Sequence, residues 1–271
     1  MNILDKLGNW LFDSCCILDD DVEDAVYTGE TGTTATAVTV TTVTDEQEPE
    51  PETGQTETPI QPMKEYKYVI LLDNGHASST PGKRSPKLDD GRQFFEYEFN
   101  RDVVRRIAER LKALGVKYEI LVPELDRDVS LSTRADRANA FCKEYGTDNC
   151  IFISVHANAA GNGSSWCTAK GFSCYTSKGE TASDPYAELF MRKAHEVLDP
   201  IGYSIRKYSA KKYSWEENFT VLVKTHCPAV LTENLFYDNK KEVEFLLSDE
   251  GRDAIAEIHV RTIMAIENGE L

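Results

Sequence analysis

The chain has 271 residues, 41% of them hydrophobic, and a net charge of −16. This size suits one large domain, or one domain with an appendage, and the apolar content is sufficient for a packed core. Binding to nucleic acid needs an excess of Lys and Arg, so the negative charge argues against nucleic acid as a partner. No stretch has the length and apolarity of a membrane-spanning helix, so no membrane span is expected.

Residues 1–64 differ from the rest of the chain in charge and composition. They hold two Lys and 14 acidic residues, a net charge of −12. Within them, residues 28–62 contain twelve Thr and neither Lys nor Arg. Such a segment cannot bury enough apolar surface to offset the entropy lost on ordering. We therefore predict a largely disordered N-terminal segment and linker over residues 1–64, and a folded domain over residues 65–271.

The N-terminus and the cysteines indicate where the protein is made. The first residues lack a basic segment followed by a long apolar run, so we expect no secretory signal and synthesis in the cytoplasm. The seven Cys are an odd number without C-x-x-C spacing. That usage is typical of a reduced chain rather than of a disulfide framework.

From about residue 65 the sequence alternates between apolar runs typical of strands and stretches with helical spacing of apolar residues. Strands are predicted at 69–72, 116–122, 150–155, 171–176, 219–223 and 229–232. Helices are predicted at 96–114, 130–145, 184–198, 240–247 and 250–268. The alternation indicates an α/β fold with a single, mostly parallel twisted sheet and helices on both faces. Residues 203–218 have no clear pattern.

Polar residues follow three of the predicted strands. His76 comes after the run Val69–Leu72 and the turn-forming Asp73-Asn-Gly, His156 follows residues 150–155, and Glu233 follows residues 229–232. Ligands of open α/β sheets collect at the carboxyl edge of the strands. We therefore expect these three side chains to lie close together.

Two His and a carboxylate at one sheet edge fit a hydrolytic zinc site, which needs three protein ligands and one open position. His76 and His156 supply two. Glu96, in the first turn of a predicted helix, is preferred as the third ligand over Glu98, which lies about 200° further round the helix. Glu233 then remains to activate the attacking water as general base.

Each of these residues also has a simpler interpretation. A single His at a strand end is more often a turn or packing residue, and a first-turn carboxylate such as Glu96 stabilises a helix electrostatically without any further role. We interpret His195, His226 and His259 as structural, the first and last within helices and His226 in a turn before Pro228.

The run from residue 66 to residue 268 resembles the zinc-dependent N-acetylmuramoyl-L-alanine amidases of the amidase 3 family, and it has five of their motifs in the expected order. They are Asp73-Asn-Gly-His76, Glu96 with Asn100, Leu131-Ser-Thr-Arg134-Ala-Asp-Arg-Ala138-Asn139, Ser154-Val-His156-Ala-Asn158 and Pro228-Ala-Val-Leu-Thr-Glu233. Asn74 and Ala77 stand where the family usually has Pro and Gly, which affects the turn that aims His76.

The resemblance implies a peptidoglycan hydrolase that cleaves the amide bond between N-acetylmuramic acid and L-alanine of the stem peptide. One zinc ion would be bound by His76, Glu96 and His156, and Glu233 would be the catalytic carboxylate. We also assign Asn158 to substrate binding. Together with the expected absence of a signal, the resemblance suggests a phage or prophage endolysin that acts on the bacterial cell wall after release.

Two alternatives stay open at this point. A zinc peptidase acting within the stem peptide would use the same ligands on a different bond. A non-catalytic wall-binding module would keep the fold without turnover, although the intact set of His76, Glu96, His156 and Glu233 argues against it. The sequence leaves undecided the oligomeric state, the peptidoglycan chemotype and the role of residues 1–64.

Overall fold

The computed structural model describes residues 65–271, and the predicted disordered segment over residues 1–64 lies outside the described residues. The strands are β1 (Val69–Asn74), β2 (Lys117–Ile120), β3 (Cys150–Asn158), β4 (Ser173–Thr176), β5 (Trp215–Glu216) and β6 (Ala229–Phe236). The helices are α3 (Glu96–Leu114), α4 (Leu131–Tyr145), α5 (Asp184–Leu198), α6 (Thr220–Lys224), α7 (Lys240–Leu247) and α8 (Asp249–Glu267), with short 3-10 turns at Thr147–Asn149 and Asp199–Ile201.

The strands form one sheet in the order β2-β1-β3-β6-β4-β5. Strands β2, β1, β3 and β6 run parallel to one another, whereas β4 pairs antiparallel with β6 and parallel with β5. The prediction of a single, mostly parallel sheet is therefore confirmed. Because β1, β3 and β6 are adjacent and parallel, their carboxyl ends share one edge of the sheet.

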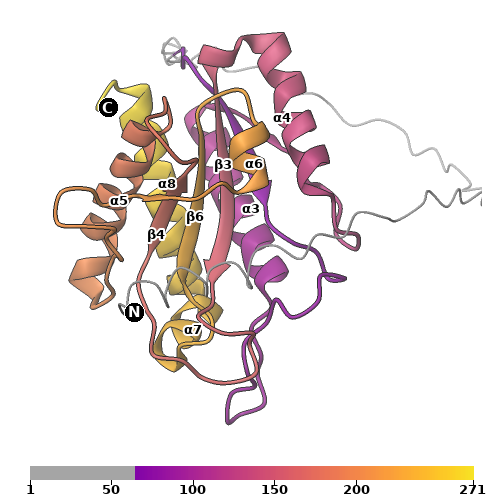
Figure 1. The fold of residues 1–271 in the computed structure, drawn as a ribbon, viewed down its shortest axis with the longest axis vertical. Coiled ribbons are helices and arrows are strands. Elements are labelled where there is room, and N and C mark those ends of the chain that lie inside the picture. The colour runs from indigo at the N-terminus through magenta and orange to yellow at the C-terminus, as the bar shows by residue number, and fades with distance from the viewer. Residues whose placement is uncertain (1–64) are drawn as a thin grey trace, which may run out of the picture. The chain divides into compact units, whose positions relative to one another are not determined.

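Helices cover both faces of the sheet, as predicted. Helices α3, α5 and α8 pack together on one face, and α4 and α6 pack together on the other (Figure 1). Successive residues of β1 face opposite sides: Ile70 and Leu72 join the core under α3 and α8, and Val69 and Leu71 join the core under α4 and α6. A strand buried on both faces reads as a continuous apolar run, which explains the sequence pattern of β1.

Helix bounds were predicted better than strand bounds. The helices predicted at 96–114 and 184–198 match α3 and α5 residue for residue, and α3 ends at Gly115 in the left-handed conformation. The strand predicted at 219–223 is wrong, because this segment forms helix α6 on α4. A short apolar run fits a buried strand and a buried helix equally well by periodicity. Residues 203–218 form connecting structure with the short strand β5.

Candidate metal centre and active site

The three predicted polar residues do meet at the carboxyl edge of β1, β3 and β6, although two of them lie inside their strands. His76 follows the last residue of β1 by two positions, whereas β3 runs past His156 and β6 runs past Glu233. His156 and Glu233 are direct partners in the register of the parallel pair. Residues paired in this way project to the same face of a sheet, so both side chains face one cleft.

Glu96 brings the first turn of α3 into the same site. Its Oε1 atom lies 3.1 Å from Nδ1 of His156 and 3.4 Å from Nε2 of His76, and it also accepts a hydrogen bond from the backbone N–H of Ala157. Glu98 is exposed on another side of the helix. Of the two first-turn carboxylates, Glu96 is therefore the one that lies beside the two imidazoles, and its role as a metal ligand stays a prediction.

The donor set of His76, Glu96 and His156 fits a zinc ion. One donor atom from each residue lies within 4.8 Å of the others. Zinc bonds to nitrogen and oxygen of about 2.1 Å place tetrahedral donors about 3.4 Å apart. The distances from Glu96 to the two imidazoles match that spacing, and two imidazoles with a carboxylate are typical zinc ligands.

The turn between β1 and the following loop is shaped by its close approach to His156. His76 has a φ of 62°, in the left-handed region that residues with side chains rarely adopt. A Cβ atom on Gly75 would lie 2.0 Å from Cε1 of His156. Only glycine therefore allows the backbone at position 75 to pass the imidazole ring.

Burial and mutual attraction set the charges in the cluster. Burial alone would raise the pKa of Glu96, but the His76 and His156 rings hold it well below its usual range. Burial lowers the pKa of His76, an effect that Glu96 opposes. For His156 burial also acts to lower the pKa, yet the hydrogen bond to Glu96 and the charges of Glu96 and Glu233 raise it overall. Glu96 is thus ionised and electrostatically tied to both imidazoles.

Glu233 has the properties of a proton-transfer group. It is 7% exposed, and its Oε2 atom has no hydrogen-bond partner among residues 65–271. Burial raises its pKa to about 7, with a further rise from the charge of Glu96 and an opposing effect of His156. A carboxyl group that gains and loses a proton near neutral pH suits general acid–base chemistry.

Asn158 ends β3 beside these residues and lines the same cleft of about 340 Å3. Its Oδ1 accepts a hydrogen bond from the N–H of Ala159, whereas its buried Nδ2 has no partner within the described part of the chain. An unsatisfied buried donor costs about 1–3 kcal/mol, so this amide is suited to a ligand.

The cleft also contains residues that the sequence reading missed. Lys83, Phe219 and Tyr237 line it together with the predicted residues. Lys83 comes from the polar loop after His76, which has no periodicity that predicts its position. Phe219 begins the segment 219–223 that was wrongly predicted as a strand and instead precedes helix α6. Tyr237 lies four residues beyond Glu233 and directly follows β6, so the rule of strand ends finds it once β6 is known to run to Phe236 rather than to residue 232.

The remaining His lie outside the cleft. His195 and His226 are exposed, and His259 is buried in α8. His259 contacts the site only indirectly, through a 3.0 Å hydrogen bond between its Nε2 and the hydroxyl of Thr232, the residue before Glu233.

Fold and site together define an α/β protein with a His-Glu-His candidate metal centre and an adjacent buried carboxylate. The model of the N-acetylmuramoyl-L-alanine amidase family matches residues 70–265, most of the chain. The chain belongs to this family. Among residues 65–271, no helix is long and apolar enough to cross a membrane.

Individual relatives are similar over the same region. An endolysin of Bacillus phage SPP1 is 32% identical over 207 residues, covering 74% of this chain and 66% of that protein. The N-acetylmuramoyl-L-alanine amidase CwlM of Bacillus licheniformis is 29% identical, covering 70% of this chain and 65% of that protein. The match thus spans just under two thirds of these relatives. A crystal structure of an N-acetylmuramoyl-L-alanine amidase from Clostridium difficile 630 shares the fold, with a TM-score of 0.60, 22% identity, and coverage of 76% of this chain and 100% of that one.

Proposed function

We propose that the protein is a zinc-dependent N-acetylmuramoyl-L-alanine amidase that hydrolyses the amide between N-acetylmuramic acid and L-alanine in bacterial peptidoglycan. The observation that carries the proposal is the meeting of His76, Glu96 and His156 beside Glu233, in a chain of the amidase family. Similarity to a phage endolysin supports a role in breaking down the cell wall.

His76, Glu96 and His156 would hold one zinc ion. When bound, zinc supplies a Lewis acid that polarises the scissile carbonyl and acidifies the attacking water. The deeply buried carboxylate of Glu96 carries one negative charge into the site, which offsets part of the charge of the cation. Gly75 leaves the space that the His156 ring needs in order to face His76.

Glu233 performs the proton transfers. Its carboxylate removes a proton from water as the water oxygen attacks the carbonyl carbon of the amide. The protonated carboxyl group then delivers that proton to the nitrogen of L-alanine as the C–N bond breaks. The products are a muramic acid carboxylate and a stem peptide with a free amino terminus. Burial of Glu233 raises its pKa and so favours its uptake of the proton from water.

Asn158 orients the substrate. Asn158 lines the cleft beside Glu233 and His156, and its buried Nδ2, which has no partner among the described residues, would donate to a carbonyl oxygen of the substrate. Such a donor binds one end of the amide or acetamido group and leaves Glu233 free for water.

The test is mass spectrometry of purified peptidoglycan digested with the full chain, before and after treatment with a zinc chelator. We expect stem peptides that begin with L-alanine, their loss on chelation and their return when zinc is added. Fragments cut inside the stem peptide would contradict the amidase assignment in favour of a peptidase. Bound zinc without any product would contradict it in favour of a wall-binding module.

A further inference from the structure

The turn that carries His76 is held by side chains from two helices. Three consecutive backbone carbonyls there each accept a hydrogen bond from a different side chain. The pairs are Asn74 O with Arg134 Nη1 at 3.0 Å, Gly75 O with Asn100 Nδ2 at 3.0 Å, and His76 O with Arg101 Nη1 at 2.7 Å. No helix or strand supplies the donors to these three carbonyls. The pairing of β1 with β3 holds the start of the turn through the Gly75 N–H, which donates to Val155 O at 3.2 Å, and the three side chains hold its carbonyl side.

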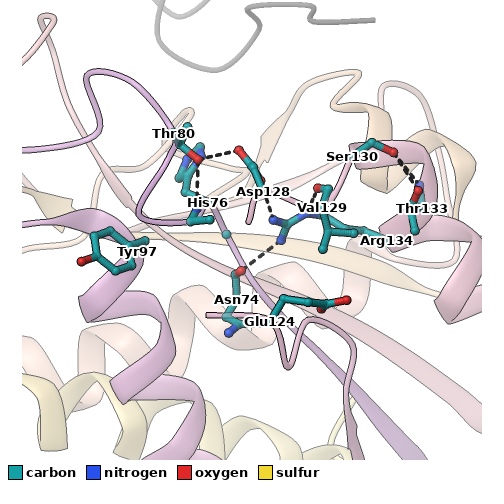
Figure 2. Close-up of polar contacts among 12 residues, drawn as sticks. Asn74, His76, Thr80, Tyr97, Glu124, Asp128, Val129, Ser130, Thr133 and Arg134 are labelled. Carbon is teal, nitrogen blue, oxygen red and sulfur yellow. Dashed lines mark hydrogen bonds and ion pairs between the residues drawn. The ribbon is translucent and has the colours of Figure 1, made fainter. Parts of the chain in front are cut away.

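Arg134 of α4 holds one side of the turn. It is 2% exposed, and its Nη1 also donates to Asp73 Oδ1 at 2.7 Å. Its Nη2 donates to Asp128 Oδ1 at 3.0 Å, and the other oxygen of Asp128 accepts from the Thr80 hydroxyl at 2.5 Å. The Thr80 hydroxyl also accepts a hydrogen bond, at 2.9 Å, from the backbone N–H of Ala77, the residue after His76. Figure 2 shows this chain of hydrogen bonds, from Thr80 through Asp128 to Arg134, beside His76.

Arg101 of α3 holds the other side. While its Nη1 donates to His76 O, its Nη2 donates to Glu124 O at 2.9 Å. Arg134 likewise donates through Nε to Val129 O at 2.7 Å. Each guanidinium thus joins the His76 turn to the segment 121–130 after β2. A planar guanidinium with five N–H donors can donate to two carbonyls at once in this way. A Lys ammonium, at the end of a flexible chain, cannot reproduce this fixed arrangement of donors.

The backbone of His76 needs such support. A residue other than glycine in the left-handed region carries a cost of about 1–2 kcal/mol, so an unrestrained turn would relax and carry the imidazole with it. We infer that Asn100, Arg101 and Arg134 are positioning residues that fix the His76 backbone so that its ring meets Glu96 and His156. The inference rests on the zinc site of the proposed function.

Arg101→Lys in the full chain is the principal test, because Arg101 is only half-buried and the charge is retained. The dissociation constant for zinc is measured by competition with a chromogenic chelator, and the melting temperature of the zinc-free protein is measured alongside. We expect zinc binding to weaken about 10-fold to 100-fold, the range for residues that orient metal ligands. The zinc-free melting temperature should change by less than about 4 °C.

Arg105→Lys is the matched control. Arg105 lies one turn further along α3 and is exposed. Within residues 65–271, its side chain forms hydrogen bonds only with Asp102 and Glu109. Its replacement should leave zinc affinity unchanged. Thr80→Val is a second variant, which removes the link between Ala77 and Asp128 without disturbing Arg134, and it should also weaken zinc binding.

The outcomes separate the inference from the function on which it rests. Wild-type affinity for zinc in both Arg101→Lys and Thr80→Val would overturn the positioning role and leave the zinc site standing. A loss of zinc-free stability with unchanged affinity would assign these residues to folding alone and overturn the inference as well. A wild-type protein that binds no zinc would overturn both the proposed function and the inference.

Discussion

Gly75 lies against the ring of His156 so closely that a Cβ atom at position 75 would come within 2.0 Å of Cε1. The His156 ring in turn stands nearly perpendicular to that of His76, with ring centroids 4.9 Å apart. The backbone after β1 therefore forms one wall of the candidate metal centre, and the next residue, His76, is a proposed ligand.

Gly75→Ala should disrupt metal binding. The added methyl group must displace either the His156 ring, which separates it from Glu96, or the turn, which moves His76 away from Glu96. We expect zinc binding and amidase activity to be lost, as measured by metal content after gel filtration and by release of stem peptides. Gly161→Ala is the control, because a Cβ atom there meets its nearest neighbour, the Cys167 sulfur, at an ordinary 3.5 Å. Normal zinc content in Gly75→Ala would refute the steric argument.

Glu233→Gln should separate catalysis from metal binding. The amide keeps the size of the carboxyl group but cannot take a proton from water, and loss of a general base costs about 10²-fold to 10⁴-fold in rate. We expect kcat to fall by that factor with zinc affinity unchanged. Glu98→Gln, on the exposed side of the first turn of α3, should retain both properties. An active Glu233→Gln enzyme would exclude Glu233 as the base.

Asn158→Ala should lower kcat/KM for the substrate while leaving the metal centre intact. It removes the buried Nδ2 donor of a residue that lines the cleft. One hydrogen bond contributes about 1 kcal/mol, so kcat/KM should fall about 3-fold to 10-fold with zinc affinity unchanged. Asn149→Ala is the control, since Asn149 is exposed at the other end of β3 and its amide donates to Tyr145 O. Equal kinetics for the two variants would remove Asn158 from the site.

The sequence predicts those site residues that stand next to a local pattern, either an apolar run or a helical spacing of apolar residues. His76 and His156 follow apolar runs that are strands, and Glu96 opens a helix whose apolar spacing is regular enough to give its bounds correctly. Glu233 was predicted to follow β6 and instead lies within it, because polar residues at a buried edge do not break a strand that still has hydrogen-bond partners on both sides.

The rest of the site depends on contacts between distant segments. Asn100, Arg101 and Arg134 act on carbonyls of a turn 25 to 60 residues away in sequence. Every residue has a backbone carbonyl, so the sequence does not indicate which carbonyls accept these hydrogen bonds. Lys83 reaches the cleft from a loop without periodicity. Helix α6 was mistaken for a strand because its five residues contain too little pattern to fix a period.

His259 provides a prediction on stability and pH. It is completely buried in α8, where its Nδ1 lies 2.8 Å from Ile255 O and its Nε2 lies 3.0 Å from the Thr232 hydroxyl. A neutral imidazole satisfies both contacts, with Nδ1 donating to the carbonyl and Nε2 accepting from the hydroxyl. Burial lowers the pKa of His259 to about 4, against 6.5 for an ordinary His.

The sign of the pH effect follows from this depressed pKa. Between pH 6.5 and pH 4 the unfolded chain binds a proton at His259 and the folded protein does not, so stability is fully present above pH 6.5 and is lost as the pH falls toward 4. The loss from pH 7 to pH 5 is about 2 kcal/mol. Urea unfolding of the zinc-free protein at both pH values measures this loss of stability.

In His259→Asn, whose amide can still donate to Ile255 O, the loss of stability from pH 7 to pH 5 should be smaller by that amount. The other titrating groups are the same in both proteins, so their contributions cancel in the comparison. His195→Asn removes an exposed imidazole from α5 and should behave as wild type. An equally steep drop in His259→Asn would show that the acid sensitivity of the fold originates elsewhere.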